Sequence, residues 1–517
     1  MTMTRRTLLK FLAAAVPALK GARGFALDET APPIQTGPFK GTRESLRAYR
    51  IPSWFRDAKF GIWAHWGPQS ATEYGDWYAR NMYIQGEWQY EHHVKTYGHP
   101  SKFGFKDIIP TWKADKFDAD YLVGLYKKAG AKYFVSLAVH HDNFDLWDSK
   151  HTRWNSVRMG PKRDIVGLFR RAALRHGLRF GVSEHLAMSY KWFSVSHGSD
   201  KQGPLAGVPY DGVNPLYADL YHDIREVYVD LPWNLDNTSE AFKRQWYLRI
   251  RDLVDKYEPD LLYTDGEIPF GDWGLMQTAN LYNLSARRHG GRVEAVQLSK
   301  KREDCETGTC AMDVERGVVE TIWPAPWQSH TCVGNWHYLK GALYKTPKTV
   351  IDMLVDVVSR NGNLLLNFPL PNSGMLDAEE LKILAAITEW MRTNGEAVYA
   401  TRPWKIYGTG PSTRAGSEAD AKFNESKRKD LTAEDVRFTR KGQTLYAFFM
   451  GWPERREVAI APLGSAAGKV RNVALLGHRG RLRWSQDEAG LRVQLPPEPP
   501  GAHAFALKIN GLDLDRV

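Results

Sequence analysis

Short apolar runs alternate with longer amphipathic stretches along the first 400 residues of the chain. The runs, which have the length of buried strands, lie at 60–64, 133–139, 180–183, 261–264, 293–298 and 364–368. The amphipathic stretches lie at 119–128, 164–175, 241–256, 349–360 and 378–391. Apolar strands joined by helices predict a parallel sheet covered by helices, and over this length a (β/α)8-like barrel fits best. A doubly wound sheet is the alternative, although no GxGxxG motif follows a strand.

The pattern changes near residue 402. A polar stretch at 412–430 precedes period-two segments at 436–439, 444–449, 458–461, 470–475 and 504–509. Lys441-Gly442 is placed to form a hairpin turn between the first two segments. We therefore predict a catalytic barrel domain over 40–401 and an antiparallel β-sandwich over 402–517.

Residues 1–26 have the composition of an export signal. An arginine pair precedes an apolar run at 8–18, and small residues lead to Ala26. The segment TRRTLLK at 4–10 resembles a twin-arginine signal peptide, which predicts a periplasmic or secreted protein. The run is too short and too rich in alanine for a transmembrane helix, so we expect no membrane association after cleavage.

The charge and the cysteines restrict the classes of partner. The chain carries a net charge of +11, and removing the five positive charges of residues 1–26 leaves +6. This mildly basic balance is compatible with an anionic substrate but not typical of a nucleic-acid-binding protein. Of the three cysteines, the spacing favours a disulfide bridge between Cys305 and Cys310, with Cys332 free. The sequence has no CxxC pair, so a zinc site built on thiolates is not expected.

Ionisable side chains follow four of the predicted strands. His65 follows the first strand, His140 and His141 the second, His185 the third and Asp265 the fourth. The carboxyl ends of barrel strands share one mouth, so these side chains are expected to form a site. Adjacent strand residues point to opposite faces, so both His140 and His141 reach the mouth only if the strand breaks there.

The segment 54–82 carries aromatic side chains beside carboxylates. The loop after His65 holds Glu73, Asp76, Trp77 and Tyr78. Flat aromatic faces and hydrogen-bond acceptors suit a sugar, although a buried core strand with a satisfied histidine has the same pattern. Tryptophan supports the first interpretation, because 16 of the 19 tryptophans lie before residue 400.

Several ordered motifs resemble glycoside hydrolase family 29, the α-L-fucosidases. They are WFRDAKFGI at 54–62 with AHWG at 64–67, EYGDWYARNM at 73–82, VHHDNF at 139–144, DLLYTDG at 260–266 and NGNLLLNF at 361–368. The resemblance covers about residues 40–405. It implies a retaining exo-α-L-fucosidase that needs no cofactor or metal and acts on fucosylated oligosaccharides or polysaccharides.

The resemblance also implies roles for individual residues. Asp265 matches the family's nucleophile, and Glu315 resembles the acid/base, with Glu267 and Glu320 as alternatives. The residues matching sugar-binding positions are His65, Asp76, Trp77, His140, His141, Tyr263 and Trp327. Trp327 is expected to cover the methyl group of fucose. The insertion at 192–227 is expected to shape the leaving-group side.

Two other function classes are compatible with these residues. One is a metal-dependent hydrolase using His140, His141, His185 and Asp265, which the lack of an HExxH-type spacing disfavours. The other is a non-catalytic carbohydrate-binding relative, which the presence of both Asp265 and Glu315 disfavours. The basic mature chain also allows sulfated fucans as substrates, and the sequence leaves the oligomeric state open.

Overall fold

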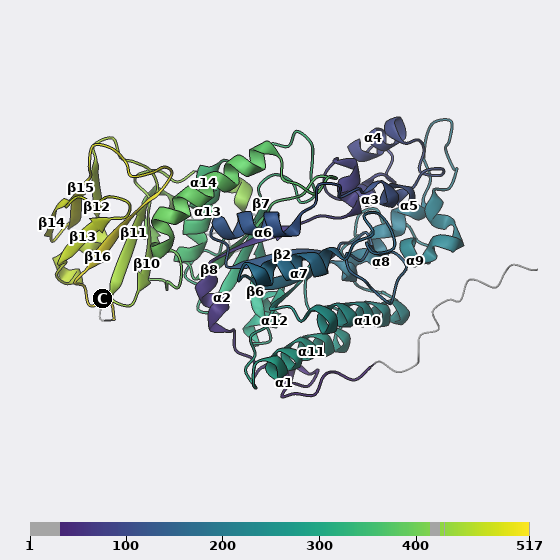
Figure 1. Cartoon of the computed structure of the whole chain (residues 1–517), viewed down its shortest axis with the longest axis horizontal. Coiled ribbons are helices and arrows are strands. Elements are labelled where there is room, and N and C mark those ends of the chain that lie inside the picture. The colour runs from purple at the N-terminus through teal and green to yellow at the C-terminus, as the bar shows by residue number, and fades with distance from the viewer. Residues whose placement is uncertain (1–31, 414–423, 429, 516–517) are drawn as a thin grey trace, which may run out of the picture. The chain divides into compact units, whose positions relative to one another are not determined.

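The computed structural model describes residues 32–413, 424–428 and 430–515. The predicted signal peptide at 1–26 therefore lies outside the described residues. Within the described part, no helix combines the length and the apolar character needed to cross a bilayer. The chain from Ile34 onward forms one compact unit, in which a barrel is followed by two antiparallel sheets (Figure 1).

Eight parallel strands form a closed barrel in sequence order. They are β1 (Phe60–Ala64), β2 (Tyr133–Val139), β3 (Arg179–Glu184), β4 (Leu261–Thr264), β5 (Val296–Ser299), β6 (Ala311–Glu315), β7 (Trp327–Cys332) and β8 (Gly362–Asn367). Pairing of β8 with β1 closes the ring, with Phe60 opposite Leu364 and Trp63 opposite Asn367. The barrel prediction is confirmed, and the doubly wound alternative is wrong.

Helices surround the barrel (Figure 1). The longer ones are α4 (Trp88–Thr96), α6 (Ala119–Lys128), α7 (Ile165–Arg175), α10 (Glu240–Tyr257), α11 (Asp272–Arg288), α13 (Pro347–Ser359) and α14 (Ala378–Asn394). The short ones are α1 (Arg43–Leu46), α2 (Ser53–Ala58), α3 (Tyr78–Asn81), α5 (Phe105–Ile108), α8 (Ser189–Trp192), α9 (Ala218–Tyr221) and α12 (Arg302–Glu306). Helix α14 begins with a capping box, in which the Asp377 side chain accepts from the Glu380 backbone and Glu380 accepts from Asp377 in return.

Strands β6 and β7 carry polar residues inside the barrel, which explains why apolar runs did not predict them. The Gln328 amide donates to Asp313 Oδ1 at 2.8 Å and accepts from the Tyr133 hydroxyl at 2.9 Å. Gly61 leaves room for this tyrosine, since a Cβ there would lie 2.3 Å from the ring. Gln328, Asp313 and Tyr133 thus satisfy one another by hydrogen bonds, so these strands do not need apolar side chains at these positions.

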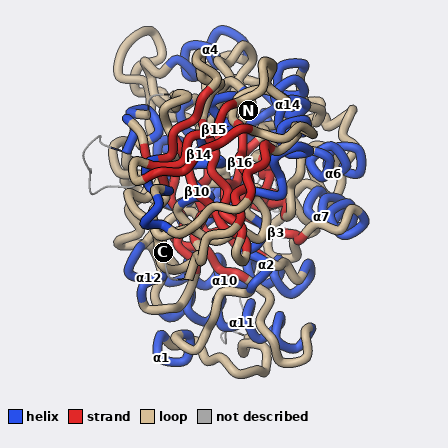
Figure 2. Tube along the Cα trace, turned by 90° about the vertical axis from the view of Figure 1, so that its left-hand side faces the viewer, coloured by secondary structure: helices blue, strands red, loops and turns tan. Residues whose placement is uncertain are grey.

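The C-terminal strands form two antiparallel sheets around an apolar core. One sheet has the order β13 (Asn472–Leu475), β16 (Phe505–Asn510), β11 (Thr444–Phe449), β10 (Val436–Lys441), β9 (Gly408–Thr409). The other has the order β12 (Glu457–Ile460), β15 (Gly490–Gln494), β14 (Arg483–Asp487). Figure 2 shows these strands in front, with barrel helices behind them. The sandwich prediction is confirmed, and Gly442, at φ 56°, lies in the predicted hairpin turn.

A buried carboxylate links the barrel helix α13 to the sandwich strand β10. Asp356 Oδ1 accepts from Arg437 Nε at 2.6 Å and also from Arg360, while Oδ2 accepts from Arg428 at 2.9 Å. Burial by itself raises the pKa of Asp356, but the three guanidinium groups outweigh it and hold the pKa far below its usual value. The carboxylate is therefore ionised at neutral pH and joins the two parts of the chain.

Asp356→Ala is expected to lower the free energy of unfolding by about 3–5 kcal/mol at pH 7, because it leaves Arg437 buried and unpaired. Since the pKa of Asp356 is depressed on folding, its contribution is complete above the unfolded value near 3.8 and is lost as the pH falls below it. Urea unfolding from pH 7 to pH 3 measures both effects. The exposed pair of Asp487 and Arg492 is the control, and Asp487→Ala should lower the free energy of unfolding far less than Asp356→Ala does. Equal losses for the two variants would contradict the role of Asp356.

Candidate active site

The carboxyl ends of the barrel strands surround a cavity of about 1190 Å³. Its lining includes the residues that directly follow four strands: His65 after β1, His140 after β2, His185 after β3 and Asp265 after β4. The four strand ends thus meet at one mouth, as parallel closure requires.

Asp265 receives hydrogen bonds on both carboxylate oxygens. Oδ1 accepts from the Tyr263 hydroxyl at 3.1 Å and from the Lys300 ammonium. Oδ2 accepts from His185 Nδ1 at 3.1 Å, and His141 Nε2 lies 3.3 Å away. The side chain is only 13% exposed, so these partners replace water around the anion.

The surroundings of Asp265 keep it ionised. Burial favours the neutral acid, but the positive charge of Lys300, the neighbouring His185 and the hydrogen bonds from His141 and His185 lower the pKa well below its usual value. The opposite effect operates on Lys300, because burial favours its neutral form while Asp265 and Glu315 together raise the pKa of the ammonium above its usual value. The site therefore holds a carboxylate and an ammonium in direct contact.

Lys300 also contacts Glu315, so one ammonium connects two carboxylates. Lys300 follows the end of β5, and Glu315 is the last residue of β6. Two hydrogen bonds to one nitrogen hold the bonded oxygens of Asp265 and Glu315 less than about 6 Å apart. Glu315 is 14% exposed on its side chain, and His330 Nε2 lies 4.0 Å from it.

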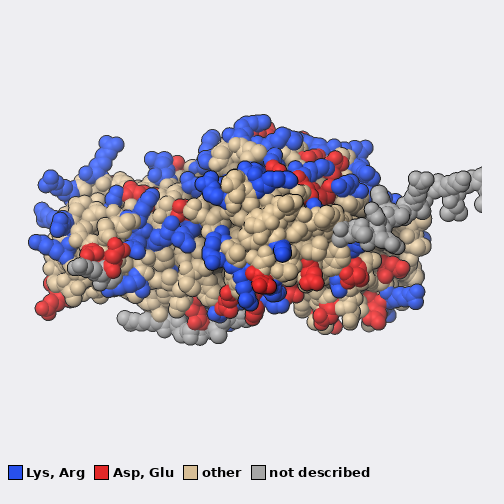
Figure 3. All heavy atoms as spheres, turned by 90° about the horizontal axis from the view of Figure 1, so that it is seen from below, with Lys and Arg blue, Asp and Glu red and all other residues tan. Residues whose placement is uncertain are grey.

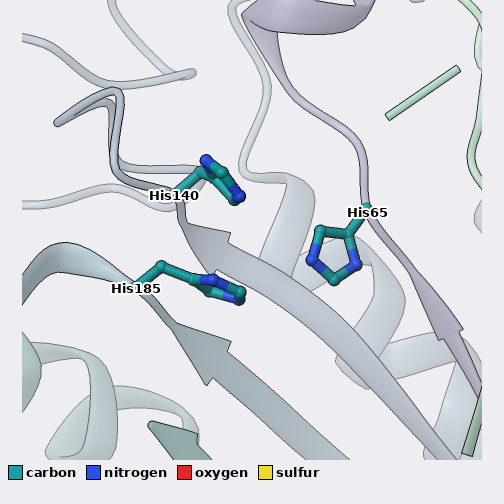
Figure 4. A group of neighbouring side chains, drawn as sticks. All are labelled: His65, His140 and His185. Carbon is teal, nitrogen blue, oxygen red and sulfur yellow. The ribbon is translucent and has the colours of Figure 1, made fainter. Parts of the chain in front are cut away.

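Histidines form the inner wall of the cavity. His65, His140 and His185 extend from the ends of three neighbouring strands toward a common space (Figure 4). Their ring centroids are 5.9 Å apart for His65 and His140, and 4.7 Å apart for His140 and His185. Burial lowers the pKa of His65 and of His140 well below the usual value, and lowers that of His185 to about 4. These imidazoles are neutral near pH 7 and can both donate and accept hydrogen bonds.

The ends of β2 and β3 explain how His140 and His141 both reach the cavity. The register between these strands shifts between Leu137 and Val139, and β2 ends at Val139. His140 then contacts Gln69, whose Nε2 lies 3.0 Å from His140 Nδ1, while His141 Nδ1 lies 2.8 Å from the His185 carbonyl oxygen. The condition that the sequence set for both histidines, a break in the strand, is met.

Three overlapping groups of side chains have the spacing of metal ligands. They are His65, His140 and His185; Asp76, His140 and His337; and His141, His185 and Asp265. In the last group the Lys300 ammonium already contacts Asp265, and a divalent ion there would meet its positive charge. In the second group Asp76 already accepts a hydrogen bond from His337 Nδ1 at 2.6 Å. In the first group, no ammonium in the described part of the chain contacts the histidines. Two of its ring nitrogens, His65 Nδ1 and His185 Nε2, have no hydrogen-bond partner among the described residues.

The cavity contains nearly all residues that the sequence singled out. Its lining includes the predicted residues His65, Asp76, Trp77, His140, His141, Tyr263, Asp265, Glu267, Glu315 and Glu320. Trp327 is the exception. It is the first residue of β7, so it lies at the opposite end of the barrel from the mouth, and its indole N–H donates to the Arg360 carbonyl at 2.9 Å. The expectation that Trp327 covers the sugar is wrong, and Trp336 and Trp323 line the cavity instead.

Two further expectations need correction. The residues of the β3–β4 connection that line the cavity lie before or after the predicted segment 192–227 and not within it; they are His185, Met188, Trp233, Leu235 and Asp236. All three cysteines are free thiols, so the predicted bridge is not formed, although the Sγ atoms of Cys305 and Cys310 lie 2.8 Å apart.

The sequence did not single out Lys300, Trp63, His330, Trp336 or His337, all of which lie at the site. Lys300 follows a strand end, as Asp265 does, and that position was the available signal. His330 lies on the polar strand β7, which apolar patterning could not find. Trp336 and His337 follow β7, and no periodic pattern marks their loop.

The chain matches two family models. The model described as alpha-L-fucosidase matches residues 26–396, and the model described as alpha-L-fucosidase C-terminal domain matches residues 428–510. The chain belongs to the α-L-fucosidase family, glycoside hydrolase family 29. It is therefore a glycoside hydrolase, and the barrel followed by antiparallel sheets is the architecture of this family.

Relatives of the chain carry the same name. Tissue α-L-fucosidase of Bos taurus is 29% identical over 495 residues, covering 90% of each chain. Plasma α-L-fucosidase of Homo sapiens is 29% identical over 483 residues, covering 89% of this chain and 88% of the relative. The crystal structure of Thermotoga maritima α-fucosidase in complex with fucose superposes with a TM-score of 0.70 at 26% identity, covering 91% of this chain and 99% of the other.

Lys300→Met is expected to move the acid limb of kcat/KM for an aryl α-L-fucoside to higher pH by about 1–3 units, because Asp265 loses the cation that lowers its pKa. The limb of kcat/KM reports the free enzyme, where this contact exists. Lys301→Met is the matched control, since Lys301 pairs with Glu267 at the exposed rim. An unchanged limb in Lys300→Met would show that Lys300 does not control ionisation of the pair.

Proposed function

We propose that this chain is a retaining exo-α-L-fucosidase that releases terminal α-linked L-fucose through a covalent glycosyl-enzyme intermediate. The observation that carries the proposal is the contact of Asp265 and Glu315 with one ammonium group. This contact limits the two bonded oxygens to a separation below about 6 Å, which is compatible with the roughly 5–5.5 Å of retaining glycosidases and too short for the roughly 6.5–9.5 Å of inverting ones.

In the first step, a carboxylate oxygen of Asp265 attacks the anomeric carbon and the bond to the glycosidic oxygen breaks. The departing oxygen takes the proton of the Glu315 carboxylic acid. In the second step, the Glu315 carboxylate removes a proton from water as the water oxygen attacks the anomeric carbon, and Asp265 leaves as the carboxylate. Two inversions at this carbon give net retention.

Glu315 fits the acid/base role better than Glu267 or Glu320. It is largely buried and shares Lys300 with Asp265, whereas the Glu267 side chain is 40% exposed and pairs with Lys301. Glu320 is exposed at the rim of the cavity. A proton donor must lie within hydrogen-bond reach of the glycosidic oxygen, and a side chain beside the nucleophile meets this condition better than one at the exposed rim.

The histidines and Asp76 are placed to hold the sugar hydroxyls. Neutral buried imidazoles at His65 and His140 offer hydrogen-bond donors and acceptors to the hydroxyls of a bound sugar. Trp77, Trp63 and Trp336 add aromatic surface around them. A small sugar with one apolar methyl group and several hydroxyls matches this mixture.

We further propose export by the twin-arginine signal at 1–26 and a periplasmic or secreted location, on the strength of the TRRTLLK segment. Lys and Arg side chains are numerous on the end of the molecule that the C-terminal sheets form (Figure 3). This basic surface is compatible with an anionic glycan outside the cavity.

Asp265→Ala is expected to lower kcat for an aryl α-L-fucoside by at least about 10⁴-fold, because the nucleophile is lost. Added azide should restore partial turnover by entering from the side that Asp265 vacates, which gives the β-fucosyl azide. Proton NMR of the wild-type reaction should detect α-L-fucose as the first product. A β-anomer formed first would overturn the retaining mechanism, and no turnover of any fucoside would favour a carbohydrate-binding protein.

Glu315→Ala is expected to slow an oligosaccharide by about 10²–10⁴-fold and an activated aryl fucoside much less, because a good leaving group needs little protonation. Azide should here give the α-fucosyl azide, since it attacks the intermediate from the side opposite Asp265. Glu267→Ala and Glu320→Ala serve as controls. Equal losses on both substrates would assign the acid/base role elsewhere, and loss of wild-type activity with a chelator would indicate a metal-dependent hydrolase.

A further inference from the structure

The cavity extends well beyond the space around Asp265 and the histidines. Its volume of about 1190 Å³ exceeds the roughly 300–1,000 Å³ of most small-molecule sites. Its outer wall comes from the connections that follow four consecutive strands. One residue from each is Trp233 after β3, Glu267 after β4, Lys301 after β5 and Trp323 after β6. This outer part lies where the leaving group of a bound glycoside would emerge.

Two tryptophans face this outer part from different sides of the mouth. Trp233 belongs to the β3–β4 connection and Trp323 to the β6–β7 connection. These connections are three strands apart in a ring of eight, so they approach the cavity from nearly opposite directions. Trp233 is 54% exposed and lines the cavity, so its ring is accessible to a ligand there.

The ring of Trp323 is held in place from one side. The Arg302 guanidinium lies 4.8 Å from its centroid, and Arg302 Nε donates to Glu306 Oε1 at 2.5 Å. This contact orients the indole and occupies one of its faces. The remaining ring surface is the part of Trp323 that can meet a sugar.

Charge selects among possible leaving groups. Eight carboxylates line the cavity against three basic side chains. In the outer part, the basic side chains are Lys301, paired with Glu267, and Arg302, paired with Glu306, while Asp236 and Glu303 add negative charge. An anionic group entering here would meet net negative charge with both neighbouring cations already paired.

We propose that the outer part of the cavity is a subsite for the leaving-group sugar of a neutral fucosylated oligosaccharide, with Trp233 and Trp323 as its contact surfaces. The inference rests on the proposed fucosidase function and narrows its substrate class. It places sulfated glycans outside the preferred substrates of the cavity, even though the mature chain is basic overall. The acidic wall repels sulfate, while the indole rings favour the C–H faces of an uncharged sugar.

Trp233→Ala and Trp323→Ala test the contact surfaces. We compare kcat/KM for a neutral fucosyl trisaccharide with that for α-L-fucosyl fluoride, whose leaving group has no ring. Each variant is expected to lose about 5–100-fold more on the trisaccharide than on the fluoride, the range for removing an aromatic anchor. Trp88→Ala, at a tryptophan 44% exposed and outside the cavity lining, is the matched control and should lose equally little on both.

The fluoride separates failure of this inference from failure of the proposed function. Wild-type turnover of the fluoride with parallel losses on both substrates in the tryptophan variants would overturn the subsite. No wild-type turnover of the fluoride would overturn the fucosidase function itself. Thermal unfolding of both variants identifies a folding defect, and in that case Trp233→Phe and Trp323→Phe, which keep a ring, should recover trisaccharide turnover selectively.

The charge argument has its own measurement. The wild-type enzyme is expected to prefer the neutral trisaccharide over the same compound sulfated on the leaving-group sugar by at least about tenfold in kcat/KM. The double variant Asp236→Asn, Glu303→Gln should narrow this preference, and added salt should narrow it in the wild type. Equal or better turnover of the sulfated compound by the wild type would overturn the assignment to neutral glycans.

Discussion

The pairing of β8 with β1 is the constraint on which the site depends. Asn367, the last residue of β8, accepts a hydrogen bond from the His65 backbone N–H at 2.8 Å, and the Phe368 N–H donates to the Trp63 carbonyl at 2.9 Å. The last strand therefore positions the first functional histidine. The ends of β4 and β6 flank β5, so Asp265 and Glu315 can share Lys300, which follows β5.

The sequence predicted those strands whose side chains are apolar and whose last residue is followed by a residue of the site. Apolar strands with an ionisable residue at the end located β1 to β4 and the side chains that follow them. Strands β6 and β7 escaped prediction because Asp313, Gln328 and His330 give them a polar inner face. Trp327 was misassigned for the same reason, since without the bounds of β7 its place at the start of the strand was hidden. The role of Lys300 depends on its contacts with Asp265 and Glu315, and the spacing of these three residues in the sequence does not predict those contacts.

Net charge and local charge have opposite signs in this protein. The sequence alone gives a basic chain, from which an anionic substrate follows naturally. The structure separates the charges, with many basic side chains on the surface of the C-terminal end (Figure 3) and an excess of carboxylates inside the cavity. The substrate meets the second distribution at the point of reaction. Composition therefore bears on long-range attraction, while the folded site decides which glycan is cleaved.

On the mechanism proposed above, the scissile bond lies between the two carboxyl groups, in the space where Lys300 contacts both of them. A sugar that enters must therefore take over this space from Lys300, and the ammonium must give up at least one of its partners. The contact with Lys300 holds Asp265 as the anion that the attack needs. Entry of the sugar and release of the lysine would then be one step, because both take place in the same space.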